Sequence, residues 1–171
     1  MTRTIPALMV ALFVLAIPPA TAQKAVFVVR HAEKASDAND PDVPLSEAGR
    51  ARAKNLAAVL AKAGVTAIYS TDTVRTLATG EPLAQASKIP VHRYAARDGA
   101  GRPNLAPLAR RLKAEHGWDV VLVVGHADTV PSLLKALGCS EEVEIPAGQY
   151  DDLFVVVPSG KGPPKLLRLT F

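Results

Sequence analysis

Short apolar runs alternate along the chain with longer segments whose apolar positions recur at helical spacing. The run Ala25–Arg30 is β-branched and aromatic and is bounded by polar residues, which is typical of a strand buried on both faces of a parallel sheet. A Pro/Gly-rich stretch at 158–164 indicates a turn between two final strands. The other strands are predicted at 66–70, 91–94, 120–124 and 153–157.

The segments between these strands predict helices. Ser46 is suited to cap a helix with an apolar stripe from Ala53 to Ala61, and Gly64 is placed to stop it. Thr71 or Asp72 is suited to cap the next helix, which runs to about residue 86. Two more helices are predicted at 105–116 and 130–137, the second ended by Gly138. Strand and helix alternate, which favours a layered α/β fold with a mainly parallel sheet.

The N-terminal segment has the pattern of an export signal. Arg3 precedes an apolar stretch at 7–17, and Ala20-Thr21-Ala22 matches a cleavage site. The stretch is shorter than the roughly 20 residues that span a bilayer, and Pro18-Pro19 follows it at once. We therefore expect a signal peptide over 1–22, no stable membrane anchor after its cleavage, and one domain over 23–171 in the periplasm or outside the cell.

Composition narrows the choice of ligand. The formal net charge of +4 is mild and evenly spread, which argues against a nucleic-acid partner and suits small anionic substrates. Cys139 is the sole cysteine and cannot form an internal disulfide, so we expect a buried, inert thiol.

Three predicted strands end in residues with chemical potential. Arg30-His31 and Gly125-His126 follow two strands directly, and the strand ending at Ser70 leads into Arg75. Ligands of such sheets gather beyond the carboxyl ends of the strands. Two arginines and two histidines there would form a cationic pocket for phosphate. One histidine can attack phosphorus if its other ring nitrogen is held as a donor.

These residues resemble the histidine phosphatase superfamily, which is also called phosphoglycerate mutase-like. The chain carries four segments similar to those of that family, in the same order: Val29-Arg30-His31-Ala32-Glu33, Leu45-Ser46-Glu47-Ala48-Gly49-Arg50, Tyr69-Ser70-Thr71 with Arg75-Thr76, and Val124-Gly125-His126.

The resemblance, which we assign to a small exported branch, implies a three-layer sandwich with a mainly parallel central sheet and helices on both faces. It implies that His31 is phosphorylated and that Arg30, Arg75 and His126 bind the phosphoryl group. It also implies that no metal or other cofactor is required. A histidine metal site is disfavoured independently, because adjacent arginines would repel a cation.

The proton donor to the leaving group is the least clear part of the predicted site. The candidates, in order of preference, are Asp128, Glu33 and Asp98. Carboxylates next to Tyr150, at Asp151 and Asp152, are interpreted as solvated residues at the entrance to a strand.

The preferred hypothesis is a metal-independent phosphatase that hydrolyses a phosphomonoester or a phosphoprotein through a phosphohistidine. Two alternatives remain. A phosphomutase would use the same nucleophile, and a phosphate-binding module would have kept the anion pocket without turnover. Because binding alone needs no nucleophile, the two histidines argue against the module.

Overall fold

A computed structural model describes residues 25–38, 40–117, 119–159 and 162–171, and its strands form one six-stranded sheet in the order β3-β2-β4-β1-β5-β6. Strands β1 to β4 are parallel, whereas β5 runs antiparallel to β1 and β6 antiparallel to β5. The strands are β1 (Ala25–Arg30), β2 (Val65–Ser70), β3 (Val91–Arg93), β4 (Val120–Gly125), β5 (Asp152–Val157) and β6 (Lys165–Thr170).

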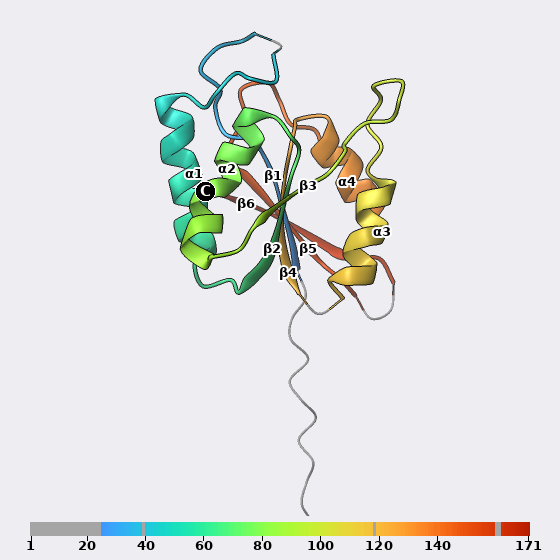
Figure 1. The fold of residues 1–171 in the computed structure, drawn as a ribbon. Coiled ribbons are helices and arrows are strands. Elements are labelled where there is room, and N and C mark those ends of the chain that lie inside the picture. The colour runs from blue at the N-terminus through green and yellow to red at the C-terminus, as the bar shows by residue number, and fades with distance from the viewer. Residues whose placement is uncertain (1–24, 39, 118, 160–161) are drawn as a thin grey trace, which may run out of the picture.

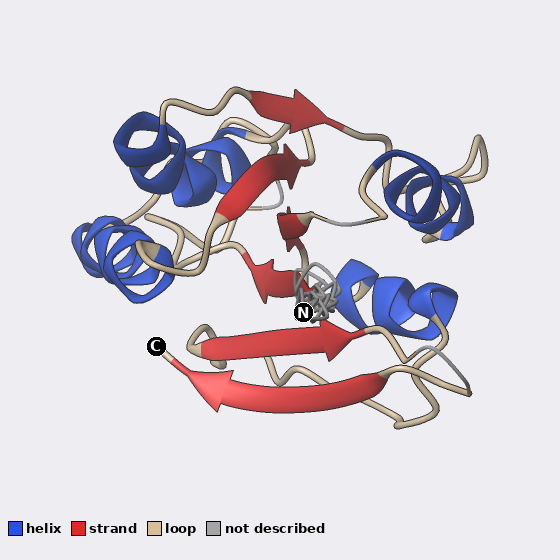
Figure 2. Cartoon of the chain, turned by 90° about the horizontal axis from the view of Figure 1, so that it is seen from below, coloured by secondary structure: helices blue, strands red, loops and turns tan. Residues whose placement is uncertain are grey.

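Four helices cover the two faces of the sheet. The helices are α1 (Glu47–Leu60), α2 (Val74–Ser87), α3 (Ala106–Glu115) and α4 (Thr129–Leu137). Figures 1 and 2 show α1 and α2 on one face and α3 and α4 on the other. The three-layer α/β sandwich expected from the sequence is therefore confirmed.

Both faces of the central strands are buried, which explains why their sequences are almost continuously apolar. Val28 packs in the cluster that contains side chains of α3 and α4, and its neighbour Val29 packs in the cluster that contains Leu56 of α1. Successive side chains of a strand point to opposite faces, so one apolar run contributes to both halves of the core.

Most helix ends follow the expected signals, with two corrections. Ser46 caps α1 by accepting from the Gly49 N–H, and Gly138, at a φ of 104°, ends α4. However, α1 ends four residues before Gly64. Helix α2 begins after Thr73 rather than after Thr71 or Asp72, and its cap residue makes no side-chain capping bond. The Thr71 and Thr73 hydroxyls are instead bonded to other side chains.

Strand register brings the predicted site residues to one edge of the sheet. Arg30 of β1 pairs with Gly125 of β4, and Ser70 of β2 pairs with Val124. The His31 N–H extends the ladder by donating to the Gly125 carbonyl over 2.9 Å. The residues that follow β1, β2 and β4 consequently meet at the upper edge in Figure 1.

The predicted signal peptide over 1–22 lies outside the described residues. Among the helices that the structure describes, none is both long and apolar enough to cross a membrane.

Candidate active site

A hollow of about 350 Å³ at the carboxyl edge of the sheet contains most of the predicted site. Five of the six predicted residues line it: Arg30, His31, Arg75, His126 and Asp128. Glu33 is not among its lining residues. An adjoining hollow of about 590 Å³ shares Thr73, Arg97 and His126 with it, which leaves room beside the histidines for the rest of a substrate.

His31 has the geometry of a nucleophile. Its Nδ1 donates to the Ala32 carbonyl over 2.8 Å, and because a carbonyl can only accept, the hydrogen of the neutral ring is on Nδ1. Nε2 has no partner within the described part of the chain and keeps its lone pair. Burial is the largest cause that lowers the pKa of His31, to about 3, and the His126 ring and Arg30 add to the effect. The ring is therefore neutral at pH 7.

The segment that carries His31 is tied to α2 by a buried hydroxyl. The Thr79 hydroxyl accepts from the Ala32 N–H over 3.0 Å and donates to the Arg75 carbonyl over 2.8 Å. One threonine thus connects the backbone of the nucleophile segment to the backbone of the second arginine.

Backbone carbonyls of the 146–150 loop hold the Arg30 side chain in place. Its Nη1 donates to the carbonyls of Pro146, Ala147 and Gln149 over 3.1, 2.7 and 2.9 Å. The Tyr150 ring lies under the guanidinium, 4.0 Å from Cζ to the ring centroid. These contacts fix the side chain at the floor of the site before any ligand binds.

Both arginines retain donors that are not satisfied. Arg75 donates from Nη1 to the Asp40 carbonyl over 2.8 Å. In the described structure, the Nε atoms of Arg30 and Arg75 are buried and have no hydrogen-bond partner. An unpaired buried donor is costly, and an oxyanion beside two guanidinium groups would offset that cost.

His126 lies beside the nucleophile and is also neutral at pH 7. The two rings are 5.4 Å apart between centroids. The His126 backbone N–H donates to the Thr129 hydroxyl over 2.8 Å, and His126 Nε2 lies 3.0 Å from the Thr71 hydroxyl. Burial is the largest cause that lowers the pKa of His126, to about 4; Arg75 lowers it further, and Asp128 opposes the shift.

The three candidate proton donors differ in position. Asp128 lies at the rim of the hollow with half of its side chain exposed and forms an ion pair with Arg97 over 2.6 Å. Glu33 is bound by Arg52 over 2.7 Å. Burial acts to raise the pKa of Glu33, but the bonds from Arg52 outweigh it and the pKa falls.

The remaining candidate, Asp98, binds Arg102 within its own loop and does not line the hollow. Of the three carboxylates, only Asp128 lines the hollow that contains His31. The geometry therefore favours Asp128 over Glu33 and Asp98.

Sequence reasoning missed three residues that support the site: Thr71, Thr79 and Tyr150. Thr73, Thr76 and Thr79 recur every third residue, and this interruption of an apolar helix face by hydroxyls was the available signal for Thr79. The expectation of solvated carboxylates beside Tyr150 is wrong for Asp152, which is buried and bound by Arg168 over 2.7 Å.

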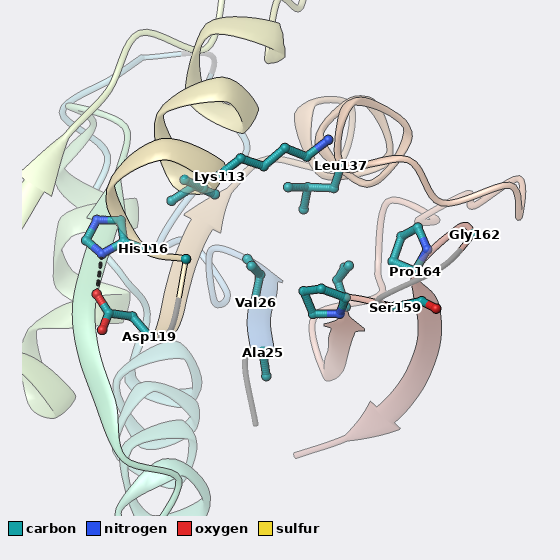
Figure 3. Close-up of a pocket in the computed structure, with 13 residues that line it drawn as sticks. Ala25, Val26, Lys113, His116, Asp119, Leu137, Ser159, Gly162 and Pro164 are labelled. Carbon is teal, nitrogen blue, oxygen red and sulfur yellow. Dashed lines mark hydrogen bonds and ion pairs between the residues drawn. The ribbon is translucent and has the colours of Figure 1, made fainter. Parts of the chain in front are cut away.

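A separate hollow of about 270 Å³ lies at the opposite end of the sheet, near the start of β1 (Figure 3). Its lining includes His116, which donates to Asp119 over 2.7 Å and accepts from the Tyr69 hydroxyl over 2.8 Å. These bonds give His116 a structural role beside this hollow. No arginine is among its lining residues, so it does not match the anion site.

The described residues contain no group of three or more His, Cys, Asp or Glu side chains placed to hold a metal ion.

Comparisons with known structures show the fold. The protein histidine phosphatase SixA in complex with tungstate aligns with a TM-score of 0.69 and 21% identity, over 85% of this chain and 96% of that chain. A second SixA structure, from Agrobacterium tumefaciens, aligns with a TM-score of 0.63 and 22% identity, over 86% of this chain and 98% of that chain. A mycobacterial glucosyl-3-phosphoglycerate phosphatase aligns with a TM-score of 0.66 and 18% identity, over 86% of this chain and 96% of that chain. No curated protein sequence matches the chain.

A family model matches residues 26–96, a range that includes Arg30, His31 and Arg75; its description is the histidine phosphatase superfamily, branch 1. His126 follows this range, and strand pairing brings it to the same edge of the sheet. The family-model match and the shared fold together support the histidine phosphatase superfamily as the family of this chain.

Proposed function

We propose that this protein is a phosphatase that hydrolyses a phosphomonoester or a phosphoprotein through a phosphohistidine on His31, without a metal ion. Membership of the superfamily supports a phosphatase-type enzyme. The observation that carries the mechanism is the His31 ring. Its Nδ1 is fixed as a donor to Ala32, which leaves an Nε2 lone pair among the two arginines and His126.

In the first step, the Nε2 lone pair of His31 attacks phosphorus. The bond from phosphorus to the leaving oxygen breaks and its electron pair stays on that oxygen, which takes a proton from the Asp128 carboxyl group. Arg30 and Arg75 stabilise the charge on the equatorial oxygens of the transferred group.

In the second step, water attacks the phosphorus of phosphohistidine and the N–P bond breaks. The Asp128 carboxylate accepts the proton that the water loses. Orthophosphate leaves, and His31 regains its lone pair on Nε2. The cycle consumes one water and restores both side chains to their initial state.

The substrate is a phosphorylated small molecule or a phosphoprotein. The adjoining hollow and the half-exposed rim at Asp128 support either class. SixA is described as a protein histidine phosphatase, and a mycobacterial protein of the same fold is described as a glucosyl-3-phosphoglycerate phosphatase. A panel of phosphopeptides and sugar phosphates, with release of orthophosphate measured, distinguishes the two classes.

The test of the mechanism is hydrolysis of p-nitrophenyl phosphate by the chain from Gln23 onward, with EDTA present. We expect activity to persist in EDTA and to fall at least a thousandfold in His31→Ala, since removal of a nucleophile abolishes the covalent route. After reaction with a ³²P-labelled ester, a label that stays on the wild-type chain in alkali and is released in acid identifies phosphohistidine. Folded wild-type chain with no turnover of any ester would instead support a phosphate-binding module.

We further propose that the signal peptide over 1–22 directs the domain to the periplasm or outside the cell. The basic residue, apolar stretch and small-residue site in the N-terminal sequence support this. Edman sequencing of the chain purified from the culture medium and from the periplasm should begin at Gln23, and a chain that retains Met1 or is found in the cytoplasm contradicts it.

A further inference from the structure

A series of three threonine hydroxyls connects the start of α2 to His126. Thr73 Oγ1 lies 2.8 Å from Thr76 Oγ1, which in turn lies 2.8 Å from Thr71 Oγ1. The last member, Thr71 Oγ1, lies 3.0 Å from His126 Nε2. Thr71 and Thr76 are buried. Each contact must therefore contain a hydrogen, because two facing lone pairs at such distances would repel.

The three hydroxyl hydrogens can satisfy the three contacts in one direction. Thr73 donates to Thr76, Thr76 donates to Thr71, and Thr71 donates to His126 Nε2. The Thr76 hydroxyl can instead donate to the carbonyls of Thr71 and Thr73, over 3.1 and 2.9 Å, while Thr71 donates to Thr76 and His126 Nε2–H donates to Thr71. Those carbonyls accept from the Ser70 hydroxyl and the Leu77 N–H. Neither direction therefore leaves these carbonyls unpaired, and the charge of the bound ligand selects between the two directions.

The direction of the series determines what His126 offers to a ligand. A neutral imidazole has one N–H, so an Nε2 that accepts from Thr71 places the hydrogen on Nδ1. Within the described structure Nδ1 has no partner, which makes it the ring nitrogen available to a ligand in the hollow. In the opposite direction Nε2–H would donate to Thr71, and the Nδ1 lone pair would face the ligand and repel an anion.

We propose that Thr71 is a positioning residue that fixes His126 as its Nδ1–H tautomer, so that the neutral ring donates a hydrogen bond to bound phosphate. The inference rests on the proposed function for the identity of the ligand. This inference deepens the proposed function because His126 would bind phosphate as a neutral hydrogen-bond donor of one defined tautomer, rather than as a positive charge.

The surroundings of His126 explain why a tautomer is needed. Burial and nearby cations lower its pKa to about 4, so the ring is not protonated at pH 7. The groups that face it are Arg75 at the start of α2, Arg97 in the loop after β3, Asp128 before α4, and Arg30 and His31 at the end of β1. Only one of these groups is acidic, and it is itself bound by Arg97.

The direct test is nitrogen-15 NMR of the labelled chain in orthophosphate. The wild-type chain and Thr71→Ser, which keeps the hydroxyl, should show His126 as the Nδ1–H tautomer. Thr71→Val should lose this tautomer preference and should bind orthophosphate about ten- to a hundredfold more weakly at pH 7, the range for loss of a hydrogen bond to a charged group. Thr170→Val, on the exposed face of β6, is the matched control and should bind as wild type.

The pH dependence separates this role from a purely structural one. As the pH falls toward the His126 pKa of about 4, the ring can take a second proton and donate from both nitrogens. The affinity difference between wild type and Thr71→Val should therefore shrink as the pH falls, whereas general damage to the fold would lower affinity at every pH. Thermal unfolding by circular dichroism checks that the valine variant is folded.

Two results overturn the inference: an Nε2–H tautomer in the wild-type complex, or wild-type phosphate affinity in folded Thr71→Val. The tautomer and the affinity are both measured with orthophosphate as the ligand, and neither measurement needs turnover. A wild-type chain that binds orthophosphate but hydrolyses no ester would contradict the proposed function and leave this inference standing. A wild-type chain that does not bind orthophosphate overturns both.

Discussion

At the residue scale, two carboxylates close to His31 in sequence or space have different partners and should have different roles. Asp128 is at the rim with an exposed arginine beside it, whereas Glu33 is paired with Arg52, which also donates to the Phe171 carbonyl. A proton donor must reach the leaving oxygen. Asp128 alone of the two lines the hollow where that oxygen would lie.

We therefore expect Asp128→Asn to slow hydrolysis of phenyl phosphate by about a hundredfold, the usual range for loss of a general acid. Hydrolysis of p-nitrophenyl phosphate should fall much less, because its leaving group is stable as an anion. Steady-state kcat for both esters measures the difference.

Glu33→Gln is the matched comparison, since it also replaces a carboxylate by an amide. Its loss of the Arg52 ion pair should cost about 1 kcal/mol or less in unfolding free energy, because both side chains are partly exposed. The ratio of its rates on the two esters should stay at the wild-type value. Equal sensitivity of both esters in Asp128→Asn would remove that residue as the acid.

At the element scale, the first turn of α1 is packed directly against the segment that carries the nucleophile. The Ser46 N–H donates to the Glu33 carbonyl over 2.9 Å, and the Ser46 hydroxyl caps the helix at Gly49. A Cβ at position 49 would lie 2.1 Å from the Glu33 carbonyl oxygen. Glycine is therefore required here by the close approach of two backbones, which gives a physical reason for the Leu-Ser-x-x-Gly segment.

Gly49→Ala should lower the unfolding free energy by about 3 kcal/mol, the upper part of the range for overpacking in a tight core. It should also reduce kcat, because relief of the clash moves the backbone next to His31. Urea unfolding and p-nitrophenyl phosphate kinetics measure the two effects. Gly99→Ala is the control, since a Cβ there meets nothing within 4 Å; equal stability of the two variants would contradict the close-approach argument.

Elements and strand ends could be predicted from sequence because they depend on local patterns. The run Ala25–Arg30 was located to the residue, and the meeting of Arg30-His31 with Gly125-His126 followed from the shared edge of parallel strands. Contacts that depend on tertiary partners could not be predicted. Thr71 was expected to cap a helix, but its hydroxyl is bonded to side chains from α2 and the end of β4.

The same limit applies to residues near the C-terminus. Tyr150 lies against Arg30 only because the 146–150 loop passes over the end of β1. Asp152 is buried because Arg168, on the antiparallel neighbour β6, covers it. Neither neighbour is visible from the local pattern of the chain, because each comes from a separate element.

At the scale of the whole molecule, the buried histidine pair couples the site to global stability. The folded state holds His31 and His126 with pKa values of about 3 and about 4, below the value of 6.5 that an unfolded chain would give. Below pH 6.5 the unfolded state therefore binds more protons than the folded state. The unfolding free energy must then decrease as the pH falls from 6.5 toward 4.

Each histidine should contribute up to about 1.4 kcal/mol of lost stability per pH unit in this window. Urea unfolding followed by circular dichroism at pH 7, 6, 5 and 4.5 should therefore show a steep decline. In His126→Asn, which has one titrating ring fewer in the site, the slope between pH 6 and 4.5 should fall to about half. His92→Asn is the control, because His92 is exposed on β3 and should leave the slope unchanged. An unfolding free energy that stays constant from pH 7 to 4.5 would mean that the two rings accept protons in the folded state, and the neutral nucleophile at mildly acidic pH would be lost with it.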